Sequence, residues 1–245
     1  MPLKNIYILL ILFVNLLFSG ISLANTNDKI MKVAAFPKQN IQGEIAVNII
    51  RAAYKGLGYD IKIHRLPGAR SIVEVNRGEL DAELMRIKGM EKSFPYLVPV
   101  KTHLMYMQVS AFSRAKNIEI QDWQDLKPFK LAFELGFKLL ENNTKGMDVI
   151  KTNGPHHAFR IMAEGKADIV IDLKLDGQAY IKQQNLTGIH MIEPALKTFP
   201  VYHYVHIQHK KLVRFLEQAL LNMHETGESA RIHERIVNKS FSHQQ

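Results

Sequence analysis

Short apolar runs alternate with amphipathic stretches along most of the chain, and this alternation limits the folds that are open to it. Residues 31–36, 59–66 and 80–87 are typical of buried strands, whereas residues 41–57 and 69–77 have the apolar spacing of helices. Gly or Pro residues follow most of these segments and end them. Strands that alternate with helices predict a parallel sheet with crossover helices, which is an α/β fold.

The same order of elements recurs further along the chain. The residues 76–82, with the sequence NRGELDA, align with residues 163–169, with the sequence AEGKADI. In both, a Gly ends a helix and an Asp opens the next strand. We therefore predict a second, similar lobe with strands at residues 130–134, 149–152 and 167–173 and helices at residues 137–143 and 156–164.

Three further segments join the two predicted lobes. Residues 103–112 are rich in strand formers and are placed to cross from the first lobe to the second, while residues 189–192 and 201–207 are placed to return. Two amphipathic helices follow at the C-terminus. We expect a double hinge between a first lobe of residues 25–108 and 194–245 and a second lobe of residues 109–193.

Residues 1–24 have the pattern of a secretion signal. Lys4 gives a positive start, residues 6–18 are apolar except for one Asn, and small residues precede a cleavage position after Ala24. The alternative is an uncleaved membrane anchor, but the apolar run is shorter than the ~20 residues that a spanning helix needs. We expect cleavage after Ala24 and export to the periplasm.

Composition and charge exclude several classes of function. The chain has no cysteine, so disulfides, thiolate metal sites and thiol nucleophiles are excluded. The net charge is +9, but Lys and Arg are spread along the chain, which does not favour a nucleic-acid partner. His203, His206 and His209 lie on or just after a predicted strand, where side chains three apart point to opposite faces. We expect no metal and no cofactor.

Four segments carry a family resemblance: residues 76–82, residues 120–136 with the sequence IQDWQDLKPFKLAFELG, residues 163–172 with the sequence AEGKADIVID, and residues 204–237. In order and spacing they resemble the family 3 extracellular solute-binding proteins, the periplasmic receptors of ABC importers for amino acids and related solutes. The resemblance implies the two-lobed periplasmic-binding-protein fold of type II, a small-molecule solute bound by hinge closure, and an importer permease or a membrane sensor as partner. We expect a monomer.

Ligands of open parallel sheets bind beyond the carboxyl ends of the strands, which predicts a site between the lobes. Arg86 ends the third strand, where it could hold a carboxylate, or form a structural pair with a nearby Glu. Arg70 and Ser71 open a helix and could cradle an anion; the alternative is a surface Arg and a helix cap. Phe36 ends the first strand as an apolar wall or a core residue.

The second lobe offers its own candidate residues. Glu134, Gly136 and Phe137 lie at a strand-to-helix turn that should face the site. Asp172 matches, by the resemblance, the Asp that takes the ammonium group of an amino-acid ligand; the alternative is a cap on the next helix. The family's usual carboxylate-binding Arg has no counterpart, because the matching region reads Glu91-Lys92-Ser93. This departure puts an ordinary α-amino-acid ligand in doubt.

Two functions follow from these residues. The first is a non-catalytic receptor that captures a small polar solute, carboxylate-bearing or amino-acid-like. The second is an enzyme on the same fold, a dehydratase acting on a cyclic amino acid, with Glu83 or Glu134 as acid or base. No nucleophile with an adjacent base is apparent in the sequence, which favours binding. An occluded site would instead favour an exported structural module.

Overall fold

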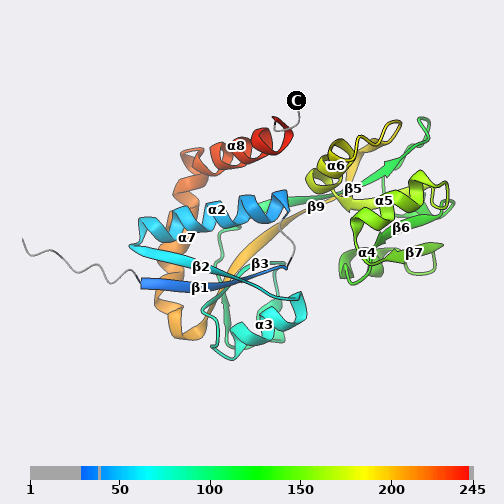
Figure 1. Ribbon diagram of the computed structural model, residues 1–245. Coiled ribbons are helices and arrows are strands. Elements are labelled where there is room, and N and C mark those ends of the chain that lie inside the picture. The colour runs from blue at the N-terminus through cyan, green and yellow to red at the C-terminus, as the bar shows by residue number, and fades with distance from the viewer. Residues whose placement is uncertain (1–28, 38–39, 243–245) are drawn as a thin grey trace, which may run out of the picture.

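The computed structural model describes residues 29–37 and 40–242. The predicted signal segment, residues 1–24, lies outside the described residues. Two α/β halves stand side by side, joined by two long strands, β5 (Met105–Ser113) and β9 (His190–His206) (Figure 1). Within the described residues, no helix combines the length and the apolar character that a membrane span requires.

The first half is built on a sheet of three parallel strands with β9 antiparallel at its side, in the order β2-β1-β3-β9. A short strand pairs with β9 as well. The strands that complete this sheet are β1 (Lys29–Ala35), β2 (Tyr59–Arg65), β3 (Ala82–Arg86) and β4 (Leu97–Pro99).

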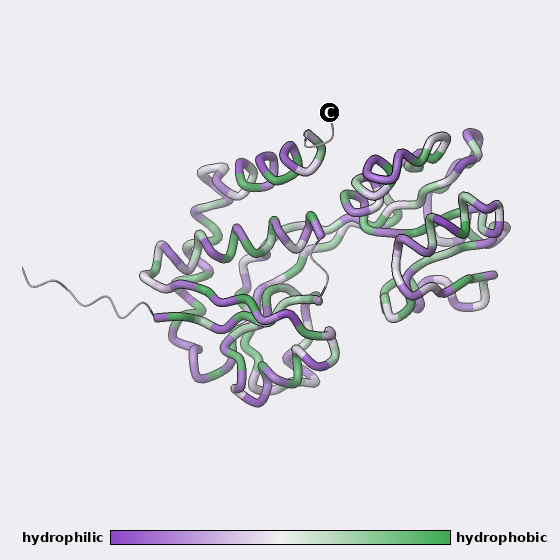
Figure 2. Tube along the Cα trace, viewed as in Figure 1, coloured by the Kyte–Doolittle hydropathy of each residue, from purple (hydrophilic) through white to green (hydrophobic). Residues whose placement is uncertain are grey.

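Helices cover both faces of this sheet (Figure 1). On one face, Ile45, Ile49 and Leu216 contribute to the main apolar core. On the other, Ile72 and Val75 belong to a smaller helix and pack in a second apolar cluster. Figure 2 shows hydrophilic and hydrophobic residues alternating along the larger helices, as expected for helices with one buried face. The helices are α2 (Ile41–Gly56), α7 (Lys210–Glu225) and α8 (Glu228–Ser242) on the first face and α3 (Gly68–Asn76) on the second.

The second half repeats the plan with the strand order β9-β5-β8-β6-β7, in which β6, β7 and β8 are parallel. Its apolar side chains form two clusters, which include Phe133 and Phe159. Its other elements are β6 (Leu131–Glu134), β7 (Val149–Thr152), β8 (Ile169–Leu173), α4 (Lys138–Asn143), α5 (Pro155–Ala163) and α6 (Lys174–Gln183). The described part of the chain also contains the short 3₁₀ helices η1 (Met90–Lys92), η2 (Gln124–Leu126) and η3 (Ile207–His209).

The predicted strands and helices are confirmed with small shifts at their ends, whereas the short strand β4 and the 3₁₀ helices were not predicted and two larger features differ. Helix α6 was not predicted, because it buries only Gly177 and Ala179 and so has no stripe of large apolar residues. Strand β9 is a single strand, whereas the sequence suggested two, because Pro194 and Pro200 interrupt the pattern of strand formers.

The strand register shows that both halves turn the carboxyl ends of their parallel strands toward the junction. Arg86, at the end of β3, pairs with Tyr202 of β9. Leu173, at the end of β8, pairs with Val109 of β5, which in turn pairs with Lys197 of β9. Tyr202 and Lys197 are five positions apart on β9, or about 17 Å at the rise of a strand. Groups that follow the two sets of strands therefore lie on facing sides of the junction.

Helix α6 connects the two halves through Asp176. The Asp176 carboxylate accepts hydrogen bonds from the Asn40 side chain at 2.8 Å and from the backbone N–H of Ile41 at 3.1 Å, at the start of α2. A Cβ on the neighbouring Gly177 would lie 2.5 Å from the Phe112 ring, so α6 sits directly against β5. A carboxylate held on the second half thus caps a helix of the first.

We predict that Asp176→Ala lowers the free energy of unfolding by about 1 kcal/mol, because the first N–H of α2 and the Asn40 amide lose their acceptor. Urea unfolding at pH 8 measures this loss. Asp60→Ala, at an exposed position on β2, is the control and should change stability little. Equal losses in the two variants would contradict a capping role for Asp176.

Candidate functional site

Five residues meet where β1 ends beside β3. Phe36 follows β1, Gly68 and Ser71 lie in the first turn of α3, and Glu83 and Arg86 belong to β3. Strands β1 and β3 are adjacent and parallel, so their ends lie at the same edge of the sheet. We refer to these five residues as the Arg86 cluster.

The guanidinium of Arg86 is held along one side. Its Nη2 donates to the Gly68 carbonyl and to the Ser71 hydroxyl, both at 2.7 Å, and lies 2.9 Å from Oε1 of Glu83. Its Nε is buried and makes no hydrogen bond within the described part of the chain. The side chain is 15% exposed. Arg86 is therefore oriented from one side, and its partly exposed guanidinium could bind a further acceptor.

Glu83 lies behind Arg86 and has no exposed surface. Burial raises the pKa of its carboxyl to about 7, against the opposing effects of the Arg86 charge and the Ser71 hydroxyl. Its second oxygen, Oε2, makes no hydrogen bond within the described residues. Ser71 Oγ lies 3.3 Å from Glu83 Oε1 and 3.1 Å from the Gly68 carbonyl, and its single proton serves one of them at a time.

Phe36 covers the guanidinium from the other side. The ring centroid lies 4.6 Å from Cζ of Arg86, a cation–π distance, and the side chain is 38% exposed. A Cβ at Gly68 would lie 2.8 Å from the Phe36 ring, so this approach needs a glycine. Arg65 donates to the Phe36 carbonyl at 3.1 Å and fixes the backbone there.

Apolar side chains surround these strand ends. Phe36 follows β1, Ile87 follows β3 and Leu135 follows β6, and all three are among the large hydrophobic residues that remain exposed. Exposed hydrophobic residues at the edge of a site favour a ligand with an apolar part. Of the three, Phe36 contacts Arg86 directly, so the Arg86 cluster combines a cation with an apolar wall.

The turn after β6 supplies the candidates of the second half. Gly136 has a φ of 87°, which favours glycine, and its N–H donates to Glu141 Oε1 at 3.0 Å. Phe137 is half-buried and packs on the apolar core of this half, while Glu134 is half-buried at the end of β6. The Gly136 N–H is thus already hydrogen-bonded to a residue of its own half. The turn itself follows the carboxyl end of β6, on the side of the junction between the halves.

Asp172 and Arg70 lie on β8 and α3. Asp172 is buried on β8, in register with Ser110, and its Oδ1 accepts from the backbone N–H of Leu173 at 2.7 Å. Arg70 is exposed and its Nε lies 2.9 Å from Glu74 Oε1 along α3. The structure thus brings Phe36, Ser71 and Arg86 into direct contact, and directs the Arg70 side chain along the surface of α3.

Sequence reasoning left open whether Arg86 pairs with a Glu, and the Glu83–Arg86 pair confirms that alternative without removing Arg86 from the junction edge. It missed Gly68, whose carbonyl and lack of a side chain shape the cluster. A Glu three residues before an Arg in an otherwise apolar strand was the available signal for the pair.

The loop after Arg86 is anchored to the sheet by Tyr204. The Tyr204 hydroxyl lies 3.1 Å from both the Ile87 carbonyl and Glu91 Oε2, and accepts from the backbone N–H of Gly89 at 3.2 Å. Burial raises the Tyr204 pKa to about 12, so it stays neutral. Glu91, which stands in the region where the resembled family has its Arg, thus has a structural partner.

The histidines lie in different surroundings. His203 is fully buried between the Tyr54 hydroxyl at 3.0 Å and the Leu84 carbonyl at 3.1 Å, and burial lowers its pKa to about 4. His209 lies 2.7 Å from Asp81. Across residues 29–37 and 40–242, no three or more His, Asp or Glu side chains are grouped as metal ligands would be.

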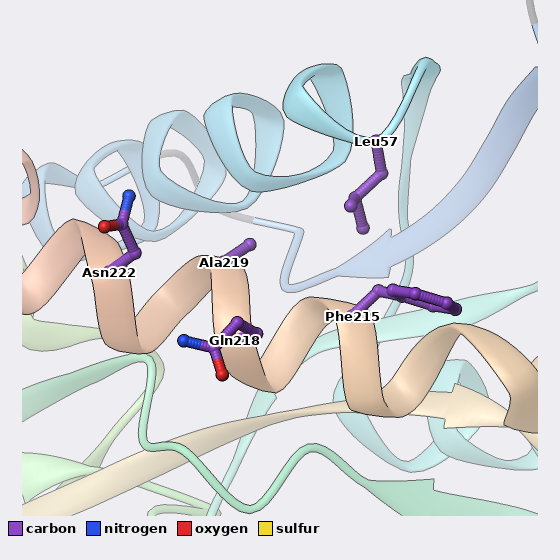
Figure 3. Close-up of a pocket in the computed structure, with 5 residues that line it drawn as sticks. All are labelled: Leu57, Phe215, Gln218, Ala219 and Asn222. Carbon is purple, nitrogen blue, oxygen red and sulfur yellow. The ribbon is translucent and has the colours of Figure 1, made fainter.

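A shallow pocket of about 360 Å³ lies elsewhere, between the turn after α2 and helix α7 (Figure 3). None of the side chains that line it is charged, and none belongs to the predicted site. They are Leu57, Phe215, Gln218, Ala219 and Asn222.

Comparison with known proteins gives a distant sequence relative. No protein-family model matches the chain. An uncharacterized protein of Shewanella oneidensis is 24% identical over 199 residues, which cover 78% of this chain and 75% of that protein.

Solved structures share the fold at low identity. The GluR0 ligand-binding core in complex with L-glutamate matches 86% of this chain and 99% of its own, with a TM-score of 0.73 and 15% identity. A histidine kinase sensor domain similar to periplasmic binding proteins aligns over 85% of this chain and 95% of its own length, with a TM-score of 0.67 and 17% identity. An amino-acid ABC transporter substrate-binding protein of Streptococcus pneumoniae, AbpA, bound to L-arginine, matches 86% and 95%, with a TM-score of 0.67 and 12% identity. The chain therefore has the two-lobed periplasmic-binding-protein fold, and the resemblance noted from the sequence is confirmed at this level.

We predict that Glu83→Gln changes the pH dependence of stability. The pKa of Glu83 is raised from its ordinary 4.5 to about 7, so its contribution to folding is present below pH 4.5 and is lost as the pH rises through 7. From pH 5 to pH 8, the wild type should lose about 2 kcal/mol relative to the variant. Unfolding of both proteins by guanidinium chloride at each pH measures the difference. Parallel curves of unfolding free energy against pH would contradict the prediction.

Proposed function

We propose that this protein is a periplasmic solute-binding protein that captures a small carboxylate-bearing solute between its two halves. The observation that carries the proposal is the Arg86 cluster, a guanidinium oriented on one side at the edge of the junction and flanked by an aromatic ring. The solute carboxylate would bind the remaining donors of Arg86, and the apolar part would pack on Phe36 and Ile87.

Closure of the halves would bring the second set of candidates to the solute. Leu135 and Phe137 would cover it from the turn after β6, and Glu134 and Asp172 are proposed to contact a donor group if the solute has one. The positive φ of Gly136 sets the direction of this turn. Arg70, at the surface of α3, is proposed to attract the anion before it reaches Arg86.

The proposed partners follow from proteins of the same fold. One neighbour is described as an ABC transporter substrate-binding protein and another as a sensor domain of a histidine kinase. We propose that the protein acts as a monomer in the periplasm, after cleavage behind Ala24, and delivers its solute to an importer permease or signals its presence to a membrane sensor.

An enzyme on this fold is the second candidate, and the position of Glu83 bears on it. A carboxyl with a raised pKa in a candidate site is a common feature of acid–base catalysts. Glu83, however, has no exposed surface and lies behind Arg86 and Ser71, out of reach of a substrate. This burial favours binding over catalysis, and Glu134 remains the other acid–base candidate.

Thermal unfolding against a panel of small molecules tests the proposal. The panel contains L-glutamate, L-arginine, L-phenylalanine, benzoate, succinate and a cyclic amino acid, L-proline. A ligand at 100 times its dissociation constant adds about 2.7 kcal/mol of stability. Stabilisation by a carboxylate supports a receptor. Conversion of a panel compound, followed by chromatography of the same samples, would move the assignment to an enzyme, and a panel without effect at any pH would overturn the carboxylate receptor.

We predict that Arg86→Lys lowers the affinity for the carboxylate solute about tenfold or more. Lys keeps the positive charge beside Glu83 but lacks the planar fork of donors that a guanidinium presents. Isothermal titration calorimetry measures the change. Arg77→Lys, at the other end of α3, is the matched control and should bind as the wild type does. Unchanged affinity in Arg86→Lys would place the solute elsewhere.

A further inference from the structure

Glu83 makes the Arg86 cluster electrically neutral when it is ionised. Its Oε1 lies 2.9 Å from Nη2 of Arg86, and its side chain is fully buried. An anion that reaches Arg86 therefore meets a charge that is already compensated. Two negative charges would then share one guanidinium away from bulk water, which is unfavourable.

We propose that the site binds an anion together with one proton: the anion replaces Glu83 as the counter-ion of Arg86, and the proton neutralises the Glu83 carboxyl. This inference rests on the proposed function and specifies the chemistry of the same site. The ligand class is that of anions, and Glu83 is the residue that couples their capture to pH.

The geometry of Glu83 suits a proton. Oε2 is buried and makes no hydrogen bond within the described residues, so the ionised carboxylate lacks part of the solvation that it would have in water. Because burial raises the pKa of Glu83 to about 7, protonation near neutral pH costs little free energy. An anion beside Arg86 would raise this pKa further, because it weakens the hold of the guanidinium on Glu83.

The other groups packed around Glu83 do not change charge in this pH range. Helix α3 offers the Ser71 hydroxyl, and the β1 residue in register with Glu83 is an alanine. On β9, Tyr204 is in register with Glu83 and has a pKa of about 12, and His203 has a pKa of about 4. Among the described residues, Arg86 is the charged group that acts on this carboxyl.

A calorimetric titration tests the coupling. The probe is the panel carboxylate that gives the largest thermal shift, titrated at pH 5.5, 7.0 and 8.5 in pairs of buffers with different enthalpies of ionisation. We expect affinity to fall with rising pH, approaching about tenfold per unit above pH 7, and proton uptake to approach one per ligand at pH 8.5. The amide of the same carboxylate, which carries no charge at that group, should bind without proton uptake.

The variant Glu83→Gln removes the titrating group and keeps its shape. It should bind the carboxylate with the same affinity at all three pH values, take up no proton, and bind about thirtyfold more tightly than the wild type at pH 8.5. Glu79→Gln is the matched control, because Glu79 is exposed in the turn between α3 and β3. This variant should keep the wild-type pH dependence. If Glu83→Gln does not fold, proton uptake by the wild type decides the question.

The outcomes separate the two proposals. A carboxylate that binds with equal affinity at pH 5.5 and 8.5 and without proton uptake overturns the coupling and leaves the receptor in place. A panel in which no carboxylate binds at any pH overturns both. A pH dependence that persists in Glu83→Gln would assign the proton to another group and overturn the role of Glu83.

Discussion

Strand β9 is the element on which the rest of the architecture depends. One end pairs with β3 and β4 of the first half, and the other pairs with β5, which carries the sheet of the second half. Strand pairing through β9 thus links the two halves, and both sets of parallel strands end at the junction. This arrangement places Arg86, at the end of β3, and Asp172, near the end of β8, on facing sides of the junction.

The Arg86 cluster shows how the fold creates a site from residues that are distant in sequence. Phe36, Ser71 and Arg86 come from a loop, a helix and a strand that the parallel order β1-β3 brings to one edge. Burial of Glu83 then gives the cluster a chemistry that an isolated Arg would not have. A surface ion pair contributes little, whereas a fully buried carboxylate ties the charge of its partner to a protonation equilibrium.

Much of this could be predicted from the sequence, since the periodicity of apolar residues places most strands and helices, and Gly and Pro end them. The position of Arg86 at the end of β3 and of Gly136 in a turn followed directly. Helix α6 could not be predicted, because its buried residues are the small Gly177 and Ala179, and the fit of Gly177 depends on the Phe112 ring across from it. The link from Asp176 to α2 joins residues more than a hundred positions apart and has no local signal.

The sequence by itself determined the α/β class, the recurrence of the strand–helix plan and the strand ends at which a ligand would bind, because these depend on local periodicity and turn residues. Only the tertiary structure decided which of the candidates touch one another. It joined Arg86 to Ser71 and Glu83, turned Arg70 toward Glu74 and anchored the loop of Glu91 to Tyr204. Such contacts depend on burial and on the register of strands, which are set by residues far apart along the chain and have no local signal in the sequence.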